Sequence, residues 1–108
     1  MHALLIAAVL AAPPPWLKDA VRRPIAAWTT ARAGWVVVAR AAPCAPLRVE
    51  LVVSTESGAE VADGHLIAAG CRTRVALLRG GTLELSHPGS VWRYRSHGRR
   101  LLLARVAP

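Results

Sequence analysis

Residues 67–108 constrain the fold more than any other part of the chain, because tight turns divide them into pieces of strand length. Turns are predicted at residues 80–81, 87–89 and 96–98, each of which contains glycine. Between these turns apolar and polar residues partly alternate, which is typical of a sheet with one buried face. This region therefore predicts a series of short antiparallel strands.

The first of these hairpins also predicts a register. If the two glycines form a two-residue turn, Leu78 pairs with Leu83. Ala76 then pairs with Leu85 on the same buried face. Leu77 would lie on the opposite face of the hairpin.

Two upstream runs rich in β-branched residues, 35–39 and 48–53, predict further strands. The prolines on both sides of Cys44 predict a loop between them. The acidic stretch 54–64 is predicted to be a solvated loop, because the spacing of its acids does not match a calcium-binding loop. The chain therefore predicts a mainly β fold, either a small antiparallel sheet or a partly open barrel, with an N-terminal helical segment.

The predicted helical segment covers residues 16–33. Its first part, 16–23, has helical composition, and Pro24 interrupts it. Pro24 can serve as the first-turn proline of a second helix, with Ile25 and Trp28 three positions apart on one face. A helix pair or one kinked helix follows from this pattern.

The N-terminus carries an apolar run, residues 3–12, followed by three prolines. We predict that residues 1–11 are a signal peptide cleaved after Ala11, because the run has the right length and ends in small residues. The alternative is a short buried helix. The run is far shorter than the ~20 residues that a membrane-spanning helix needs, so no stable membrane span is predicted. The chain then divides into the leader, a Pro-rich spacer with the helical segment at 12–33, and a β domain at 34–108.

The chain contains two cysteines, Cys44 and Cys71, which are consistent with export to the periplasm and one disulfide. Such a bridge would stabilise the fold by about 3–4 kcal/mol in the chain-entropy model. In the cytoplasm, the alternative location, the same residues would be two buried thiols. No metal site is predicted, because the chain lacks a Cys-x-x-Cys motif and its four histidines are irregularly spaced.

The positive charge is concentrated at the C-terminal end. The net charge of the chain is +8, and residues 71–108, with eight arginines and the single acid Glu84, hold +7 of it. A basic surface on one sheet suits phosphates, anionic lipid headgroups or an acidic protein face. The sequence therefore predicts a binding surface for an anionic partner.

Two Ser-His pairs, at residues 86–87 and 96–97, raise the question of nucleophilic catalysis. Neighbouring residues on a strand point to opposite faces, so neither pair can form the hydrogen bond that a nucleophile and its base require. A third, orienting group has no recognisable place either. We predict no catalytic residues, no cofactor and no enzymatic activity.

The second hairpin supplies the candidate partner-binding residues. It sets residues 91–95 against 100–105, with aromatic side chains on one face and arginines on the other. The aromatic residues either stack on a ligand or belong to the core, and we favour the core because aromatic residues on a half-buried strand usually face it. The candidates are Trp92, Arg93, Tyr94, Arg95, Arg99 and Arg100.

Three segments resemble the flagellar P-ring assembly chaperone family. The stretch 67–89, IAAGCRTRVALLRGGTLELSHPG, and the ending 96–108, SHGRRLLLARVAP, are similar to its closing, SAF-like β-clip domain. Upstream, residues 42–51, APCAPLRVEL, resemble its Cys-x-x-Pro-Leu segment, with one residue fewer between the cysteine and the proline. The resemblance implies a periplasmic protein with a signal peptide that helps P-ring subunits assemble by protein–protein contact, with no cofactor and no reaction.

The leading hypothesis is thus an exported binding protein that uses an exposed sheet edge and its arginines to hold another protein, such as a P-ring subunit. The first alternative is a cytoplasmic nucleic-acid-binding module that uses the same arginines with Trp92 and Tyr94. The second is a pilin-like or secretion-apparatus subunit with a retained N-terminal packing helix. Against the second, the three prolines after the apolar run would break such a helix.

Overall fold

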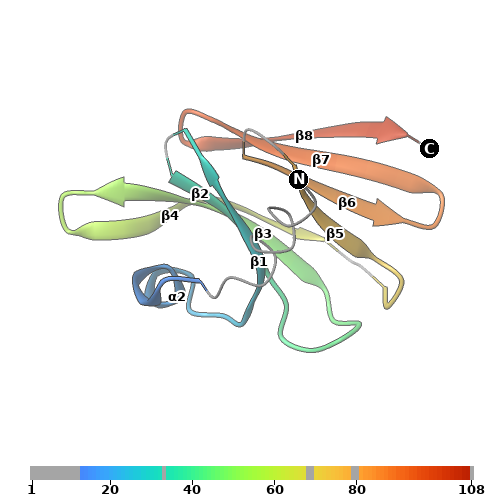
Figure 1. Ribbon diagram of the computed structural model, residues 1–108, viewed down its shortest axis with the longest axis horizontal. Coiled ribbons are helices and arrows are strands. Elements are labelled where there is room, and N and C mark those ends of the chain that lie inside the picture. Colours follow the sequence, from blue (N-terminus) through green and yellow to red (C-terminus); the bar gives the residue numbers. More distant parts are fainter. Residues whose placement is uncertain (1–12, 33, 68–69, 79–80, 108) are drawn as a thin grey trace, which may run out of the picture.

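The computed structural model describes residues 13–32, 34–67, 70–78 and 81–107. In these residues one short helix precedes eight strands, which form two four-stranded antiparallel sheets (Figure 1). Every strand pairs with the next one in its sheet, so β1–β4 form the first sheet and β5–β8 the second. The elements are α2 (Pro15–Val21), β1 (Ile25–Ala31), β2 (Gly34–Ala39), β3 (Leu47–Thr55), β4 (Gly58–Ile67), β5 (Arg74–Leu78), β6 (Thr82–His87), β7 (Ser90–His97) and β8 (Arg100–Ala107). The predicted class, mainly antiparallel β with an N-terminal helical segment, is confirmed.

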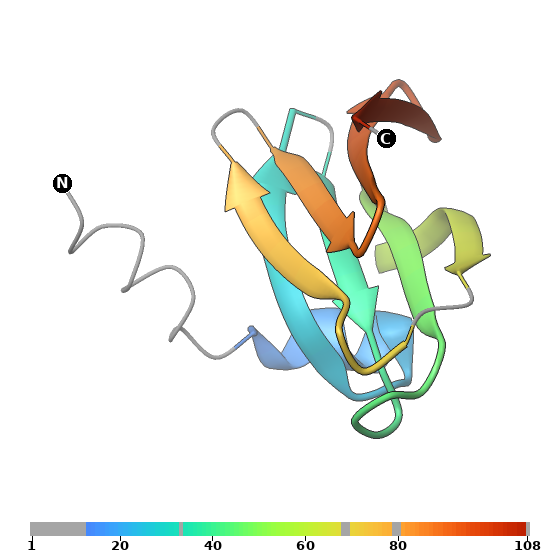
Figure 2. The ribbon, with the colours of Figure 1, turned by 90° about the vertical axis from the view of Figure 1, so that its right-hand side faces the viewer.

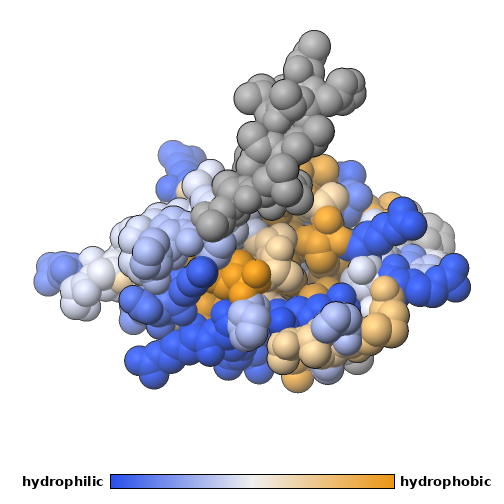
Figure 3. Space-filling view, turned by 60° about the horizontal axis from the view of Figure 1, so that its bottom comes forward, coloured by the Kyte–Doolittle hydropathy of each residue, from blue (hydrophilic) through white to orange (hydrophobic). Residues whose placement is uncertain are grey.

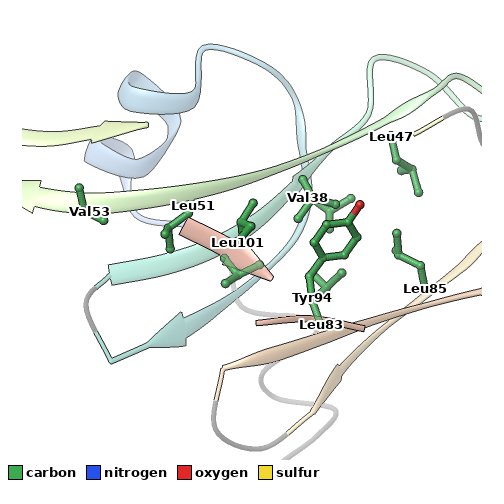
Figure 4. Close-up of a cluster of buried hydrophobic side chains, with 10 residues drawn as sticks. Val38, Leu47, Leu51, Val53, Leu83, Leu85, Tyr94 and Leu101 are labelled. Carbon is green, nitrogen blue, oxygen red and sulfur yellow. The ribbon is translucent and has the colours of Figure 1, made fainter. Parts of the chain in front are cut away.

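The two sheets pack face to face around an apolar core. Figure 2 shows β5 and β6 lying over β1 and β2, and β8 lies near β3 and β4 at the other side of the sandwich. Tyr94 of β7 points across the interface and lies beside Val38 and Leu83 (Figure 4). The buried residues of this core are Val36, Val38, Leu47, Val49, Leu51, Val53, Leu83, Leu85, Tyr94 and Leu101.

Helix α2 covers the opposite face of the first sheet. Leu17 and Val21 are buried there in a second apolar cluster with Val37 and Val52. Because β2 and β3 are covered on both faces, they contain long apolar runs instead of a strict alternation. In Figure 3, which brings the lower side of Figure 1 forward, orange apolar residues lie among blue hydrophilic ones.

The helix predicted over residues 16–33 is correct only in its first part. The second part is wrong, because β1 is a strand that pairs with β2. A β-bulge between Ile25 and Ala27 adds one residue to β1. As a result Ile25 and Trp28 both pack in the α2 cluster although they are three positions apart, a spacing that imitates a helix. The β structure therefore begins ahead of residue 34, its predicted start.

The loop predicted at residues 54–64 is also wrong, because these residues form most of a hairpin. β3 continues to Thr55, a two-residue turn follows, and β4 starts at Gly58. The acids that suggested a loop, Glu60 and Asp63, lie on β4, which is an edge strand. Charged residues are common on edge strands, where they discourage pairing with other chains.

The hairpin between β5 and β6 is present, but its predicted register is wrong by one residue. Leu77 pairs with Leu83, and Val75 pairs with Leu85. A shift of one residue moves every side chain to the other face of a strand. The observed register places Val75 and Leu77 against the core, where Leu78 and Ala76 had been expected. Core packing thus selects the register.

The remaining strand predictions are confirmed. The runs 35–39 and 48–53 lie in β2 and β3. The second hairpin is present, with residues 91–95 in β7 and 100–105 in β8. Its turn was predicted at 96–98 but lies at 98–99, because β7 continues to His97, which pairs with Arg100. Aromatic residues and arginines alternate on β7 between buried and exposed positions.

The predicted disulfide between Cys44 and Cys71 is present. It joins the loop between β2 and β3 to the connection between the two sheets. Arg40 reinforces this link, because its Nε donates to the Ala45 carbonyl and its Nη2 to the Gly70 carbonyl, both at 3.0 Å. The two connections are therefore held together by one covalent bond and by the Arg40 guanidinium.

The predicted signal peptide, residues 1–11, lies outside the described residues. The one helix that the structure describes, α2, is seven residues long. No helix in the described part of the chain has the length and apolar character needed to cross a bilayer.

Candidate partner-binding site

Exposed apolar side chains gather on and beside β8, the last strand of the second sheet. Five large apolar residues are exposed in the described part of the chain, with exposed fractions from 38% to 66%. Leu102, Leu103 and Val106 belong to β8. Leu66 belongs to β4, which shares a groove with β8, and Trp16 belongs to α2. Four of these five residues therefore lie on β8 or on β4 across the groove from it.

The backbone of β8 has one side that no described strand covers. β8 pairs with β7 and is the outer strand of its sheet. The N–H of Leu101 points away from β7 and donates to Asp63 Oδ2 of β4 at 2.8 Å. Because outward groups alternate along an antiparallel strand, the N–H and C=O groups of Leu103 and Arg105 also point away from β7. These are the groups that an added strand would pair with.

Asp63 connects the two sheets where β8 begins. Its Oδ1 accepts a bond from the Gly64 N–H at 2.9 Å, and its Oδ2 lies 3.6 Å from Nε2 of His65. The hydrogen bond from Leu101 lowers the pKa of the Asp63 carboxyl group, and the contacts with Gly64 and His65 lower it further. The ionised Asp63 carboxylate thus already accepts a hydrogen bond from the first outward N–H of β8, that of Leu101.

Beyond Asp63 a groove of about 510 Å3 opens between the sheets. His65 and Ile67 line it from β4. Trp92 and Tyr94 line it from β7, and Leu103 lines it from β8. The groove is therefore largely apolar and borders the unpaired edge of β8, so an added strand could direct its side chains into it.

Tyr94 is a core residue. It is only 1% exposed, and its ring lies edge-on to His65 with 5.6 Å between the ring centroids. Burial raises the pKa of Tyr94 to about 12. The alternative that placed the Tyr94 ring in the core is thus confirmed, and the ring is not exposed for stacking with a base.

The six candidate residues of the second hairpin do not form one cluster. Trp92 and Tyr94 point into the sandwich, whereas Arg93 and Arg95 are exposed on the opposite face of the second sheet. Arg99 lies in the turn before β8, and Arg100 begins the strand. The guanidinium of Arg105, which was not a candidate, lies 5.6 Å from the centre of the Trp92 ring.

Two of the candidate arginines have acidic partners within the chain. Nε of Arg93 lies 2.8 Å from Oε2 of Glu84 on the neighbouring strand, and Nη2 of Arg99 lies 3.0 Å from Oε1 of Glu60 on β4. Arg95 makes no ion pair with any residue that the structure describes. Exposed pairs of this kind contribute little stability, so both arginines can exchange partners at small cost.

The outer face of the second sheet is less covered than that of the first. A shallow hollow of about 740 Å3 lies on this face between Leu78, Leu102 and Val106, with Arg93 and Arg95 beside it. Helix α2, the one helix among the described residues, packs on the first sheet. Apolar and cationic groups therefore lie together on this face.

The contribution of β4 to this site was not predicted from the sequence. His65 and Ile67 lie at the end of β4, directly after the stretch 54–64 that was predicted as a loop, so no sheet edge was expected there. The run Leu101–Leu103 was a signal that could have been used, because three consecutive leucines on an outer strand must leave some of them exposed. No local pattern in the sequence predicts the hydrogen bond between Asp63 and Leu101 of β8, since the two residues are 38 positions apart.

Among the described residues, no group of three or more His, Cys, Asp or Glu side chains is arranged to hold a metal ion.

Comparisons with protein-family models, curated proteins and solved structures found no match to this chain. The site is therefore defined by its own geometry, as an unpaired strand edge beside an apolar groove with arginines around it.

Proposed function

We propose that this chain is a non-enzymatic binding protein that captures an extended segment of another protein on the edge of β8. One observation carries the proposal: the exposed apolar residues are concentrated on β8 and on β4 beside it. A segment that pairs with β8 would satisfy the outward backbone groups of Leu103 and Arg105. Its side chains would alternate between the groove and the outer face of the second sheet.

An acidic partner fits this edge better than a second copy of the chain. Residues 71–108 carry a net charge of +7, so two copies joined at β8 would bring like charges together. Arg99, Arg100 and Arg105 all lie on or next to β8. An acidic partner would be attracted by the same charges, which raises the rate of association.

The disulfide supports action outside the reducing cytoplasm, because disulfides persist in oxidising compartments such as the periplasm. The resemblance of residues 67–89 and 96–108 to the flagellar P-ring assembly chaperones gives this proposal its most specific form. In that form the captured segment belongs to a P-ring subunit, and capture prevents premature assembly of the subunit. Temporary pairing of an edge strand suits this task, since it covers surfaces that would otherwise aggregate.

The nucleic-acid alternative has less support. Its stacking platform needs exposed aromatic rings, and Tyr94 is buried. Trp92 is partly buried and has a guanidinium close to its ring. Phosphate contacts through arginines remain as the part of this alternative that an experiment must test.

The test measures binding of purified flagellar P-ring subunit to the immobilised, disulfide-bonded chain by surface plasmon resonance. We expect Leu103→Lys to weaken binding by at least about tenfold, because it places a charge where a partner strand would bury apolar groups. The matched control, Ala26→Lys, adds the same charge to an exposed position on β1, the outer strand of the first sheet, and should leave binding unchanged.

Equal loss in both variants would contradict capture at β8, since it would show a general effect of charge. Failure of the wild-type chain to bind the P-ring subunit would overturn the chaperone assignment. A single-stranded DNA oligonucleotide serves as the competing ligand. If the oligonucleotide binds more tightly than the subunit, with affinity that falls steeply as salt rises, the nucleic-acid module would be the better proposal.

A further inference from the structure

A further cavity, of about 520 Å3, lies at the end of the second sheet where β5 begins and β6 ends. Its lining includes Arg72 and Arg74, together with Ser86 and His87. None of the described residues that line it is acidic. Both arginines are exposed and make no ion pair with any described residue. The cavity therefore offers two guanidinium groups and the Ser86 hydroxyl, and the guanidinium groups have no anionic partner among the described residues.

The wall of this cavity is held in place by a short polar contact. Oγ1 of Thr73 lies 2.9 Å from Nδ1 of His87, so one of the two groups donates a hydrogen bond to the other. Thr73 is buried and stands between the two arginines in the chain. The disulfide holds Cys71, which directly precedes Arg72 in the chain. Both arginines are therefore attached to backbone that is anchored from two sides.

His87 connects this cavity to the groove beside β8. It lines the basic cavity together with Arg72 and Arg74. It also lines the apolar groove together with Trp92 and Leu103. The cationic cavity and the largely apolar groove are thus neighbours, because they share His87.

We propose that the captured segment leaves the edge of β8, crosses the groove with apolar residues, and presents beyond His87 an aspartate or glutamate whose carboxylate binds to Arg72 and Arg74 at the other edge of the sheet. This inference rests on the proposed strand capture and specifies the chemistry of the partner. Arginine suits the role because its planar guanidinium can hold a carboxylate through two parallel hydrogen bonds. The acidic residue would also fix the direction and register of the segment, which backbone pairing alone leaves open.

The test uses three pools of short synthetic peptides, each with apolar residues at alternating positions and randomised residues between them. The first pool ends in glutamate with an amidated C-terminus, the second in glutamine with an amidated C-terminus, and the third in glutamine with a free C-terminus. Each pool is passed over the immobilised, disulfide-bonded chain, and the retained peptide is measured by mass spectrometry. We expect the glutamate pool to be retained at least about tenfold more than the amidated glutamine pool, as charge-assisted hydrogen bonds predict.

The double variant Arg72→Gln/Arg74→Gln should remove this preference and still retain both amidated pools equally. Arg32→Gln is the matched control, because it removes an exposed arginine from the turn between β1 and β2. This control should keep the full preference. Circular dichroism of each variant verifies that the fold is intact.

The remaining outcomes separate the two proposals. Equal retention of the two amidated pools by the wild-type chain would overturn the carboxylate site and leave strand capture standing. Retention of the free-acid pool alone would overturn the proposal that an acidic side chain binds the two arginines. It would show that the cavity binds a C-terminal carboxylate instead. Failure to retain any pool would overturn this inference together with strand capture.

Discussion

The two sheets have the same number of strands and the same connectivity, but they are covered differently. The first sheet is buried on one face by the second sheet and on the other by α2. The second sheet is buried on one face, and its outer strand β8 leaves leucines and a valine exposed. The first sheet contains the chain's buried glutamate, Glu50, which forms an ion pair with Arg23, whereas the second carries most of the net positive charge.

This difference separates stability from binding. Apolar residues that are covered on both sides contribute to folding, because their burial removes them from water. Apolar residues that remain exposed on an unpaired edge contribute little to folding, but their burial against a partner would stabilise the complex. The first sheet is therefore expected to determine stability, and β8 with its groove is expected to determine binding.

The largest expected effect tests this separation with one substitution made in each sheet. Leu51→Ala should lower the free energy of unfolding by about 2–5 kcal/mol, because Leu51 is fully buried between the sheets. Leu102→Ala should change it by less than about 0.5 kcal/mol, since that side chain lies on the exposed face. Urea denaturation followed by tryptophan fluorescence measures both. Similar losses in the two variants would mean that β8 is covered in solution.

The next effect concerns the link between the sheets. Replacing both Cys44 and Cys71 by alanine should lower the free energy of unfolding by about 3–4 kcal/mol, since the bridge closes a loop with a sequence separation of 27. Urea denaturation of the oxidised chain and the double variant gives the difference. An unchanged free energy would show that packing of the two sheets and the bonds of Arg40 suffice.

A smaller effect is expected at alkaline pH. The chain has one tyrosine, so absorbance near the phenolate band reports Tyr94 alone. We expect the midpoint of its titration at about 12, because burial raises its pKa. Since the folded-state pKa exceeds the unfolded value of 10.0, this contribution to stability is complete below pH 10.0 and is lost as pH rises towards 12. A midpoint near 10.0 would place the ring in water and revive the stacking alternative.

The smallest effect concerns the contact between β4 and β8. The pKa of Asp63 lies below its ordinary value of 3.8, so its contribution to stability is present above that pH and is lost as pH falls through the lowered pKa. Asp63→Asn should therefore be less stable than the wild-type chain at neutral pH, and the two should converge in acid. Urea denaturation of both proteins over this pH range measures the difference. A constant difference at all pH values would show that charge is not involved.

Local sequence patterns predicted the elements better than they predicted the faces. Strands at 35–39 and 48–53 were found because β-branched runs favour extended backbone wherever they lie. The helix expected after Pro24 was wrong because a bulge reproduced helical spacing in a strand. The register of the β5–β6 hairpin was wrong by one residue because the core, which lies elsewhere in the chain, selects it.

In the candidate site, too, local features were predicted from the sequence, whereas contacts between distant segments were not. The basic hairpin and the aromatic alternation on β7 were visible in the sequence, because charge and period are local properties. The groove was not visible, since His65 and Leu103 come together only when β4 and β8 face each other across the sandwich. The basic cavity around His87 was missed for the same reason, although its arginines had been noted as part of the charged region.

The sequence by itself determined the strand-rich class, the positions of most turns, the cysteine pair and the uneven charge. Each of these depends on residues that are near one another in the chain or, for the cysteines, on their being the only two. The tertiary structure alone decided which strand edges remain unpaired, which faces are covered and where Asp63 meets β8. Burial and pairing depend on contacts between distant segments, and whether a leucine stabilises the core or remains exposed for a partner depends on what packs against it.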